Sequence, residues 1–263
     1  VTPDQKKELV LALKAQGHTV GMMGDGVNDI PALKASDCAI AMPGGSDAAR
    51  RVAQMVLLDA NFAAMPQIVM EGRRVINNIT RAASLFLVKT TFSFLLAVLL
   101  VFIPMAYPFA PIQMTLISSL TVGIPSFFLA MEPNRGRVRG NFLFNVLRNA
   151  LPGGIVIVLQ IMIMMAFSGV LGISHEQQST IAVWTTGFSS LVTLLITCLP
   201  LTFSRGMLVM LMATGFFGAA AFLGNVFYLV PLPWQMVLFA GALMALAIPA
   251  MVLMRWLIRK VMK

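Results

Sequence analysis

Six mainly apolar stretches, each of about 20 residues, fill most of the chain after residue 81 and limit its possible folds more than any other feature. Each stretch is long enough to cross a lipid bilayer as an α-helix. Charged residues make up only 11% of the sequence, against roughly 25% in soluble domains. The sequence therefore predicts an integral membrane protein with an all-α bundle of six transmembrane helices, at residues 82–103, 111–131, 149–171, 180–202, 206–229 and 234–257.

The placement of positive charge predicts the topology of these spans. Four arginines lie in the connection 132–148, Arg205 lies between the fourth and fifth spans, and four basic residues close the chain. These connections all fall on the same side as residues 1–81, and an excess of Lys and Arg marks the cytosolic side. We therefore expect both ends of the chain in the cytosol and the lipid bilayer as a partner. Because the bases flank apolar spans, the formal charge of +9 does not indicate a nucleic-acid partner.

Residues 1–70 have the pattern of a soluble α/β domain. A helix is expected at 3–17, with Leu9, Leu11 and Leu13 beside Val10 as its apolar side. Strands alternating with helices predict a parallel sheet of Rossmann type, which binds ligands at the carboxyl ends of its strands. The expected strands are 18–23, 38–42 and 55–59. Between them we expect a short helix at 31–36, and a turn followed by a helix at 44–53.

A long helix should connect this domain to the membrane. Residues 68–88 contain no strong helix breaker, and their first half is charged whereas their second half is apolar. We expect a cytosolic stalk that enters the bilayer near Ala82. This divides the chain into a partial α/β domain, 1–70, and a stalk with the six-helix bundle, 71–263. Cys38 and Cys198 are too far apart in sequence to suggest a disulfide framework.

The turn DGVND, directly after the first expected strand, is the strongest candidate site. It places the side chains of Asp25, Asn28 and Asp29 close together beside Gly24 and Gly26. Asp-Gly and Asn-Asp are ordinary turn formers. Carboxylates gathered beyond a strand end, however, are costly unless a cation or hydrogen-bond donors neutralise them. Mg²⁺, which prefers oxygen ligands, is the expected partner. The spacing does not fit an EF-hand loop, and the chain has no Walker A motif.

The longer segment MMGDGVNDIPALKASDCAIAM resembles the hinge motif of P-type ATPases, whose phosphorylation domain belongs to the haloacid-dehalogenase superfamily. TPDQK near the start resembles the lysine-bearing helix of the same domain. MVLLDANFAAMPQIVMEGRRVINNI resembles the stretch that leads into the fifth transmembrane helix of these pumps, and the likeness continues to MEPN. The resemblance covers nearly the whole chain, and it implies a haloacid-dehalogenase-type partial domain followed by transmembrane helices five to ten.

The resemblance also implies roles for individual residues. Asp25 would bind the Mg²⁺ that bridges the phosphoryl group and the site, and Asn28 and Asp29 would position the phosphate and the metal shell. Lys6 would contact the phosphoryl oxygens, although such a lysine on a helix is more often only solvated. The two glycines of the turn, Gly24 and Gly26, would let the backbone approach the phosphate. ATP would be the substrate of the complete protein.

Several parts of such a pump are absent from the sequence. There is no DKTGT motif with the phosphorylated aspartate, and residues 1–81 are too short to hold a nucleotide-binding or actuator domain. We therefore expect the chain to be the C-terminal part of a longer polypeptide whose N-terminal half is its partner. The chain alone is expected to hydrolyse no ATP. The resemblance to bacterial pumps implies the plasma membrane of a bacterium.

The cation pathway is expected in the first two spans. Lys89 is a charged residue within an apolar helix; it either extends to the interface or acts in transport. Gly123 and Pro125 can free backbone carbonyls for cation ligation. The hydroxyl candidates, each more often a small packing residue, are Thr90, Thr91, Ser93, Ser118, Ser119 and Thr121.

No carboxylate occurs in these two spans, whereas related calcium and sodium–potassium pumps carry acidic or amide ligands there. The pattern resembles bacterial pumps proposed to move calcium, so a divalent transported cation is expected. Two other interpretations stay open: a non-catalytic membrane bundle, and a phosphatase-like domain fused to a membrane anchor. The intact DGVND turn favours the pump over the first, and the stalk that leads into the membrane favours it over the second.

Overall fold

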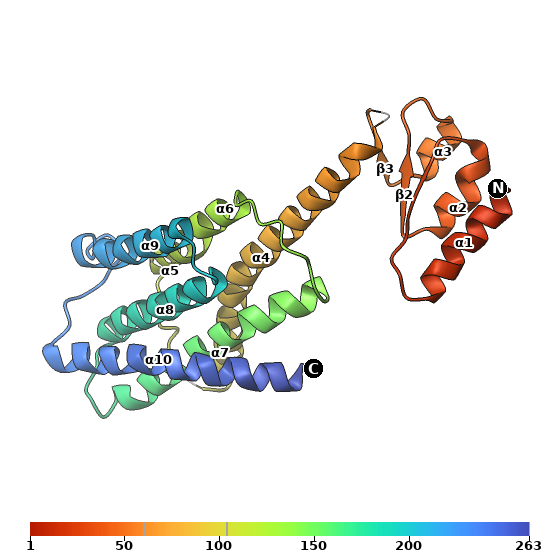
Figure 1. Ribbon diagram of the computed structural model, residues 1–263. Helices are drawn as coiled ribbons and strands as arrows, with labels where there is room; N and C mark the ends of the chain where they lie inside the picture. The colour runs from red at the N-terminus through yellow and green to blue at the C-terminus, as the bar shows by residue number, and fades with distance from the viewer. Residues whose placement is uncertain (60, 104, 263) are drawn as a thin grey trace. The chain divides into compact units, whose positions relative to one another are not determined.

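The computed structural model describes every residue except 60, 104 and 263. The chain separates into two compact units, Val1–Val69 and Met70–Lys263. The first unit contains a small sheet with short helices, and the second contains the long apolar helices (Figure 1).

Unit 1 is built around three parallel strands, as the alternating pattern predicts. The strands are β1 (Gly21–Gly24), β2 (Cys38–Ala41) and β3 (Met55–Val56), in the order β1-β2-β3. Gly21 pairs with Cys38, and Ile40 pairs with Met55. The strands are shorter than expected, and β3 ends at Val56 rather than at residue 59. The helices of the unit are α1 (Pro3–Ala15), α2 (Ile30–Ala35) and α3 (Asp47–Val52).

Helix α1 packs against α2 through a face that differs from the expected one. Val10 is buried, whereas Leu9, Leu11 and Leu13 are exposed. Residues two positions apart point to nearly opposite sides of an α-helix, so these three leucines cannot share one face with Val10. The packed face follows a four-residue spacing instead: Lys6, Val10 and Lys14.

The candidate membrane helices lie in unit 2, except that the first of them begins at Met65, a few residues before the boundary between the units. Six helical segments are long and apolar enough to cross a bilayer within the described part of the chain. They comprise α4 (Met65–Phe102), α5 (Pro111–Ser118) continued by α6 (Ile124–Ala130), α7 (Phe142–Ser168), α8 (His175–Thr197), α9 (Phe203–Phe222) and α10 (Trp234–Val261). Each overlaps one expected span. Helix α9 ends seven residues before the expected limit at 229, where Gly224 and the positive φ of Tyr228 accompany a turn.

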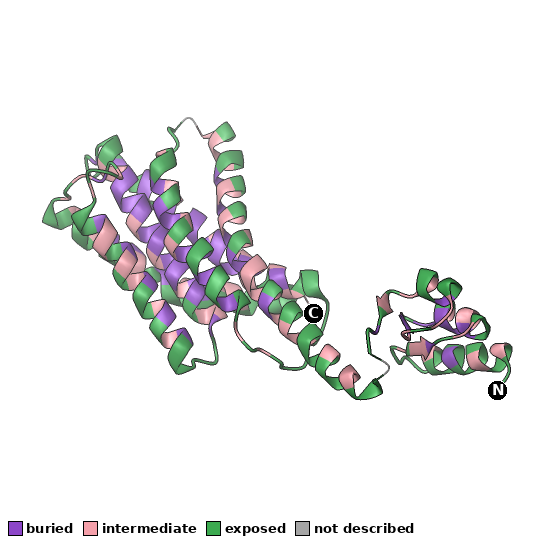
Figure 2. Ribbon diagram, turned by 90° about the horizontal axis from the view of Figure 1, so that it is seen from above, coloured by how far each residue is buried: buried purple, intermediate pink, exposed green. Residues whose placement is uncertain are grey.

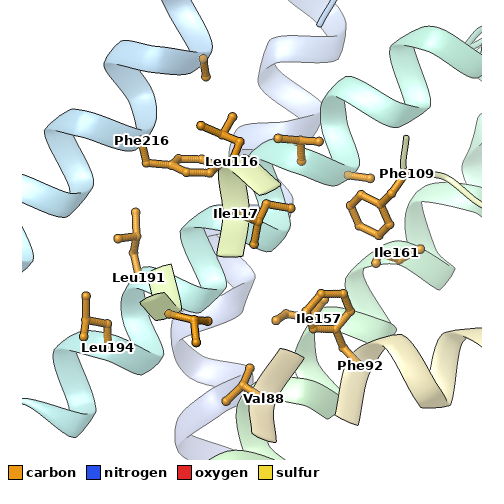
Figure 3. Packing of buried hydrophobic residues seen from close by; sticks show 14 of the residues in the cluster. Val88, Phe92, Phe109, Leu116, Ile117, Ile157, Ile161, Leu191, Leu194 and Phe216 are labelled. Carbon is orange, nitrogen blue, oxygen red and sulfur yellow. The ribbon is translucent and has the colours of Figure 1, made fainter. Parts of the chain in front are cut away.

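The core of unit 2 lies where α7 and α8 pack against α4, the α5–α6 segment, α9 and α10 (Figures 2 and 3). Phe92, Ile157, Ile161 and Phe216 are fully buried there. The outward faces of α9 and α10 carry many exposed apolar side chains, as expected for helices that contact lipid.

Two adjacent glycines bring α7 close to its neighbours. A Cβ atom on Gly153 would lie 2.6 Å from the Oγ1 atom of Thr193 in α8. One on Gly154 would lie 2.6 Å from Cγ2 of Thr91 in α4. Small residues of this kind let helix backbones approach each other in membrane proteins, and here they set the spacing of α4, α7 and α8.

Candidate functional sites

The first candidate site lies at the carboxyl end of β1, where Asp29 forms an ion pair with Lys6. The Nζ atom of Lys6 donates a hydrogen bond of 2.6 Å to Oδ1 of Asp29. The other carboxylate oxygen, Oδ2, accepts from the backbone amides of Asp25 at 3.3 Å and Gly26 at 3.4 Å. Asp29 is 6% exposed, so this buried carboxylate is satisfied by an ammonium and two backbone donors.

These contacts hold the pKa of Asp29 below its ordinary value. The hydrogen bond from Lys6 is the largest cause, and the amides of Gly26 and Asp25 and the positive charge of Lys6 act in the same direction. Burial alone would raise the pKa and opposes them in part. Asp29 is therefore ionised at neutral pH.

Local structure explains how Lys6 reaches the turn. Thr2 caps α1 by accepting from the amide of Gln5, and Pro3 occupies the first helical turn. Lys14, two turns after Lys6 on the same face, pairs with Asp37 at 2.9 Å and donates to the carbonyl of Ala35. Two ion pairs, one toward each end of α1, thus hold this helix against the rest of unit 1.

The turn itself depends on a glycine. A Cβ atom on Gly24 would lie 2.6 Å from Cβ of Asp29, so only glycine leaves room for that side chain. The 3-10 turn Val27–Asp29 follows, and the amide of Ser46 donates to the carbonyl of Asp25 at 2.7 Å. Sequence reasoning treated the loop before α3 as a simple turn, although it supports the backbone of Asp25.

The structure places the other predicted residues of this turn differently. The side chains of Asp25 and Asn28 are exposed and make no hydrogen bond among the described residues. No group of three or more His, Cys, Asp or Glu side chains suited to a metal occurs in the part of the chain that the structure describes. Mg²⁺ is commonly held by only one or two carboxylates and keeps several waters. The exposed carboxylate of Asp25 beside Asp29 therefore fits such an ion.

The second candidate site is a small cavity of about 10 Å³ inside the helix bundle. Its polar lining comes from Lys89 of α4, Thr121 of the π-helical segment Ser119–Gly123, and Ser190 and Thr193 of α8. Its volume is near the minimum for one water molecule, so it offers side-chain ligands but no room for a hydrated ion. Single π-helical turns inside α-helices occur frequently at functional sites.

The hydroxyl groups here retain acceptor capacity. Thr121 donates its proton to the carbonyl of Ile117 at 2.8 Å, and Thr193 donates to that of Ser189 at 2.9 Å. The lone pairs of both oxygens therefore stay available for a cation. Sequence reasoning missed Ser190 and Thr193, because no pattern in their span connects them with Lys89.

The remaining pathway candidates do not line this cavity. Thr90 is exposed and donates to the carbonyl of Phe86, and Thr91 packs against Gly154. Ser118 donates to the carbonyl of Met114, and Ser119 is exposed. Ser93 is half-buried on α4, outside the cavity lining. Of the seven candidates, the structure brings together Lys89 and Thr121.

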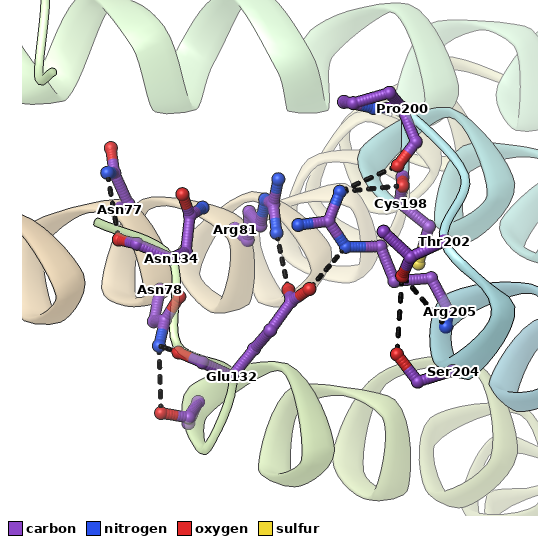
Figure 4. Close-up of polar contacts among 11 residues, drawn as sticks. Asn77, Asn78, Arg81, Glu132, Asn134, Cys198, Pro200, Thr202, Ser204 and Arg205 are labelled. Atoms are coloured by element: carbon purple, nitrogen blue, oxygen red, sulfur yellow. Dashed lines mark hydrogen bonds and ion pairs between the residues drawn. The ribbon is translucent and has the colours of Figure 1, made fainter. Parts of the chain in front are cut away.

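A third polar feature, the ion cluster of Glu132 with Arg81 and Arg205, was not predicted as a site. Arg81 of α4 donates to one carboxylate oxygen of Glu132 at 2.7 Å, and Arg205 of α9 donates to the other at 2.6 Å (Figure 4). Arg205 also donates to the carbonyls of Cys198 and Pro200. The sequence signal was the single acidic residue in a connection of arginines.

Comparison with known proteins finds cation-transporting ATPases. The chain is 44% identical over 223 residues to the calcium-transporting ATPase CtpE of Mycolicibacterium smegmatis. The aligned residues make up 80% of this chain and 28% of the relative. It is 39% identical over 230 residues to a probable cation-transporting ATPase of Streptococcus pneumoniae, covering 84% of this chain and 30% of that one.

A P-type sodium-transporting ATPase of Toxoplasma gondii is 39% identical over 133 residues, which make up 50% of this chain and 10% of the relative. The chain therefore spans less than a third of the length of the relatives that it matches. No protein-family profile matches the sequence.

Proposed function

The chain is a homologue of cation-transporting P-type ATPases, and we propose that it is the C-terminal part of an ATP-driven cation pump of the bacterial plasma membrane. Residues 1–70 would complete a haloacid-dehalogenase-type phosphorylation domain, and residues 71–263 would form the stalk and six transmembrane helices. The N-terminal half of the same polypeptide would contribute the phosphorylated aspartate and the nucleotide site. Without it, this chain hydrolyses no ATP.

The observation that carries this proposal is the Lys6–Asp29 pair at the end of β1, beside the exposed carboxylate of Asp25. Mg²⁺ would be held by Asp25 with Asp29 beside it, and it would neutralise charge on the transferred phosphoryl group. Lys6 uses one of its three donors on Asp29 and is 36% exposed at its side chain. Its other donors can therefore reach a phosphoryl oxygen.

Backbone and amide groups would complete the site. The amides of Asp25 and Gly26 hold the carboxylate of Asp29 in one orientation. Gly26 would keep the backbone accessible to the phosphate, whereas the buried Gly24 leaves room for the Asp29 side chain, and the exposed amide of Asn28 would donate to the phosphate. These side chains would orient the phosphoryl group, which is the main contribution of a protein to phosphoryl transfer.

A chimaera tests the catalytic part of the proposal. The chain would replace the matching segment of the Mycolicibacterium smegmatis relative, and Mg²⁺-dependent ATPase activity and phosphoenzyme would be measured. Asp25→Asn should abolish both, whereas Asp47→Asn, an exposed carboxylate on α3, should leave them unchanged. Equal expression and gel-filtration profiles would show that both variants fold. Normal turnover in Asp25→Asn would overturn the proposal.

For the transported ion, we propose a single divalent cation, with calcium first. Thr121, Ser190 and Thr193 would supply oxygen ligands around the cavity that also contains Lys89. The spans 82–103 and 111–131 hold no carboxylate, so the balancing negative charge would come from the N-terminal half. Lys89 would neutralise it when the site is empty, and the incoming ion would displace the ammonium group.

In the same chimaera, Lys89→Met should change the calcium concentration that gives half-maximal ATPase activity by severalfold or more. Lys34→Met, on α2 of unit 1, is the matched control and should not change it. If the two variants responded alike, Lys89 would have no part in cation binding. Activation by sodium alone would overturn the divalent assignment.

A further inference from the structure

A second, larger polar cavity lies in unit 2, and none of its lining residues belongs to either candidate site. It has a volume of about 340 Å³, within the range of small-molecule sites. Its walls come from α4, from the connection between α6 and α7, and from the first turns of α7. Three arginines line it, namely Arg81, Arg137 and Arg139, together with four asparagines, and no carboxylate contributes to the lining.

The connection between α6 and α7, which forms one wall of this cavity, is held in place by hydrogen bonds to its backbone carbonyls. The amide group of Asn77 donates to the carbonyl of Asn134 at 3.2 Å (Figure 4). It also donates to the carbonyl of Gly136 at 2.8 Å. Asn145 of α7 donates to the carbonyl of Arg139 at 2.8 Å. The cavity is therefore formed by an anchored segment, and the arginine side chains are not needed to build it.

The charges around the cavity are unbalanced. Arg81 pairs with Glu132, a carboxylate that Arg205 shares. Arg137 and Arg139 have no ion pair or side-chain hydrogen bond among the described residues. The lining holds three arginines and no carboxylate, so the cavity stays positively charged even after the pairing of Arg81 with Glu132, and positive charges held together in this way favour an anion.

The donor geometry selects a particular anion chemistry. Guanidinium groups present planar pairs of N–H donors that match phosphate oxygens. The amide groups of Asn145 and Asn149, in the first two turns of α7, add neutral donors at the positive end of that helix dipole. A phosphate group satisfies all of these groups better than a carboxylate or chloride would.

The position of the cavity indicates where such a phosphate comes from. It begins at Asn77 and Arg81, next to the point where α4 turns from polar to apolar. Phe142, Leu143 and Phe144, which directly follow the connection, are exposed apolar side chains. Arginines beside exposed aromatic groups at a helix end are typical of the headgroup region of a bilayer.

We propose that this cavity binds a phosphate group, carried by the headgroup of an anionic phospholipid, through Arg137 and Arg139. The site is independent of phosphoryl transfer at Asp25 and of the cation pathway. Arg81 contributes charge, but it is also needed to satisfy Glu132, so it is not a suitable test residue.

The test uses the 263-residue chain purified in a neutral detergent. Native mass spectrometry would count retained lipids after addition of phosphatidylglycerol or phosphatidylcholine, and a separate titration would use inorganic phosphate. Each basic side chain near a lipid surface contributes roughly a fivefold gain in affinity, so Arg137→Gln with Arg139→Gln should weaken phosphatidylglycerol binding by roughly twentyfold to thirtyfold. Arg135→Gln, in the same connection but outside the lining, is the control.

The outcomes separate the possible sources of the phosphate. Loss of phosphatidylglycerol binding in the double variant, with normal binding in Arg135→Gln, supports the lipid site. If only inorganic phosphate binding depended on Arg137 and Arg139, the site would bind a phosphate from solution. If neither binding differed between the wild type and the double variant, the proposal would be wrong. An unchanged melting temperature in phosphatidylcholine would show that the double variant folds.

Discussion

At the scale of single residues, the position of Asp29 in unit 1 is fixed by contacts on both carboxylate oxygens. Its carboxylate is buried, yet it accepts from Lys6 and from two backbone amides, and Gly24 leaves the space that it occupies. Burial of a charge is tolerated only where such donors compensate the lost water. The same contacts make Asp29 both a structural residue and a candidate part of the phosphoryl site.

Lys6→Met should destabilise unit 1 by about 1–2 kcal/mol at neutral pH, because it leaves a buried carboxylate with one donor fewer. This value allows for solvent screening, since the lysine side chain is 36% exposed. Lys7→Met, at the exposed neighbouring position, should have almost no effect. The measurement is the rate at which Cys38 of β2 is labelled in increasing urea, in a Cys198→Ser background.

The sign of the pH dependence follows from the lowered pKa of Asp29. A carboxyl group whose pKa is lower in the folded state stabilises the fold above its unfolded pKa, and that contribution is lost as pH falls through the folded pKa. The difference between wild type and Lys6→Met should therefore be full at neutral pH and shrink below about pH 4, near the unfolded pKa of an aspartate. A difference that grows on acidification would contradict this account of the ion pair.

At the scale of elements, Glu132 joins three segments that are distant in sequence. Its carboxylate accepts from Arg81 of α4 and from Arg205 of α9, and Asn78 of α4 donates to its backbone carbonyl at 2.7 Å. Arg205 extends the network to the connection between α8 and α9. One carboxylate therefore holds together the middle of α4, the C-terminal end of α6 and the first turn of α9.

Glu132→Gln should destabilise this end of unit 2 by about 3 kcal/mol, because two mostly buried guanidinium groups would lose their common counter-ion. Cys198, whose carbonyl accepts from Arg205, is itself buried and reports on this end of the bundle. Its thiol should be labelled faster in Glu132→Gln in a Cys38→Ser background. Glu176→Gln, near the first turn of α8, is the control. Equal labelling rates in the two variants would show that the ion cluster adds no stability.

At the scale of the whole molecule, the basic connections and apolar helices predict an even number of membrane crossings. The chain therefore ends on the side of the membrane on which it starts. Six helical segments qualify as candidate spans in the described residues, and the connections that carry arginine alternate with connections that carry no Lys or Arg. The expected topology therefore places residues 132–148 and both ends in the cytosol.

Cysteine labelling in intact cells would test this topology. In a background without Cys38 and Cys198, a membrane-impermeant maleimide should label Ser174→Cys, which precedes α8, and should not label Arg135→Cys. Labelling of both after the cells are lysed would show that each position is accessible. Labelling of position 135 in intact cells, with none at position 174, would show that the chain has the opposite orientation in the membrane.

Much of this architecture follows from local sequence pattern. Long apolar runs have few alternatives to membrane helices, because backbone groups in lipid must be satisfied within the helix. Alternating short strands and helices likewise indicated the parallel sheet, and the turn after β1 indicated Asp25, Asn28 and Asp29. These features depend on residues that are close together in the sequence, so local sequence determines them independently of tertiary packing.

Only the tertiary structure decided which distant side chains meet. Glu132 lies 73 residues from Arg205, and Lys89 shares its cavity with Ser190 and Thr193 from a helix about 100 residues further along. Hydroxyl groups and arginines of this kind occur throughout the chain, and no periodicity distinguishes those that converge. Packing also decided which face of α1 is buried. Val10 and the two paired lysines face the rest of unit 1, whereas the neighbouring leucines are exposed although they are more apolar than the lysines. Local pattern determines elements, whereas contacts between elements depend on close packing of their surfaces.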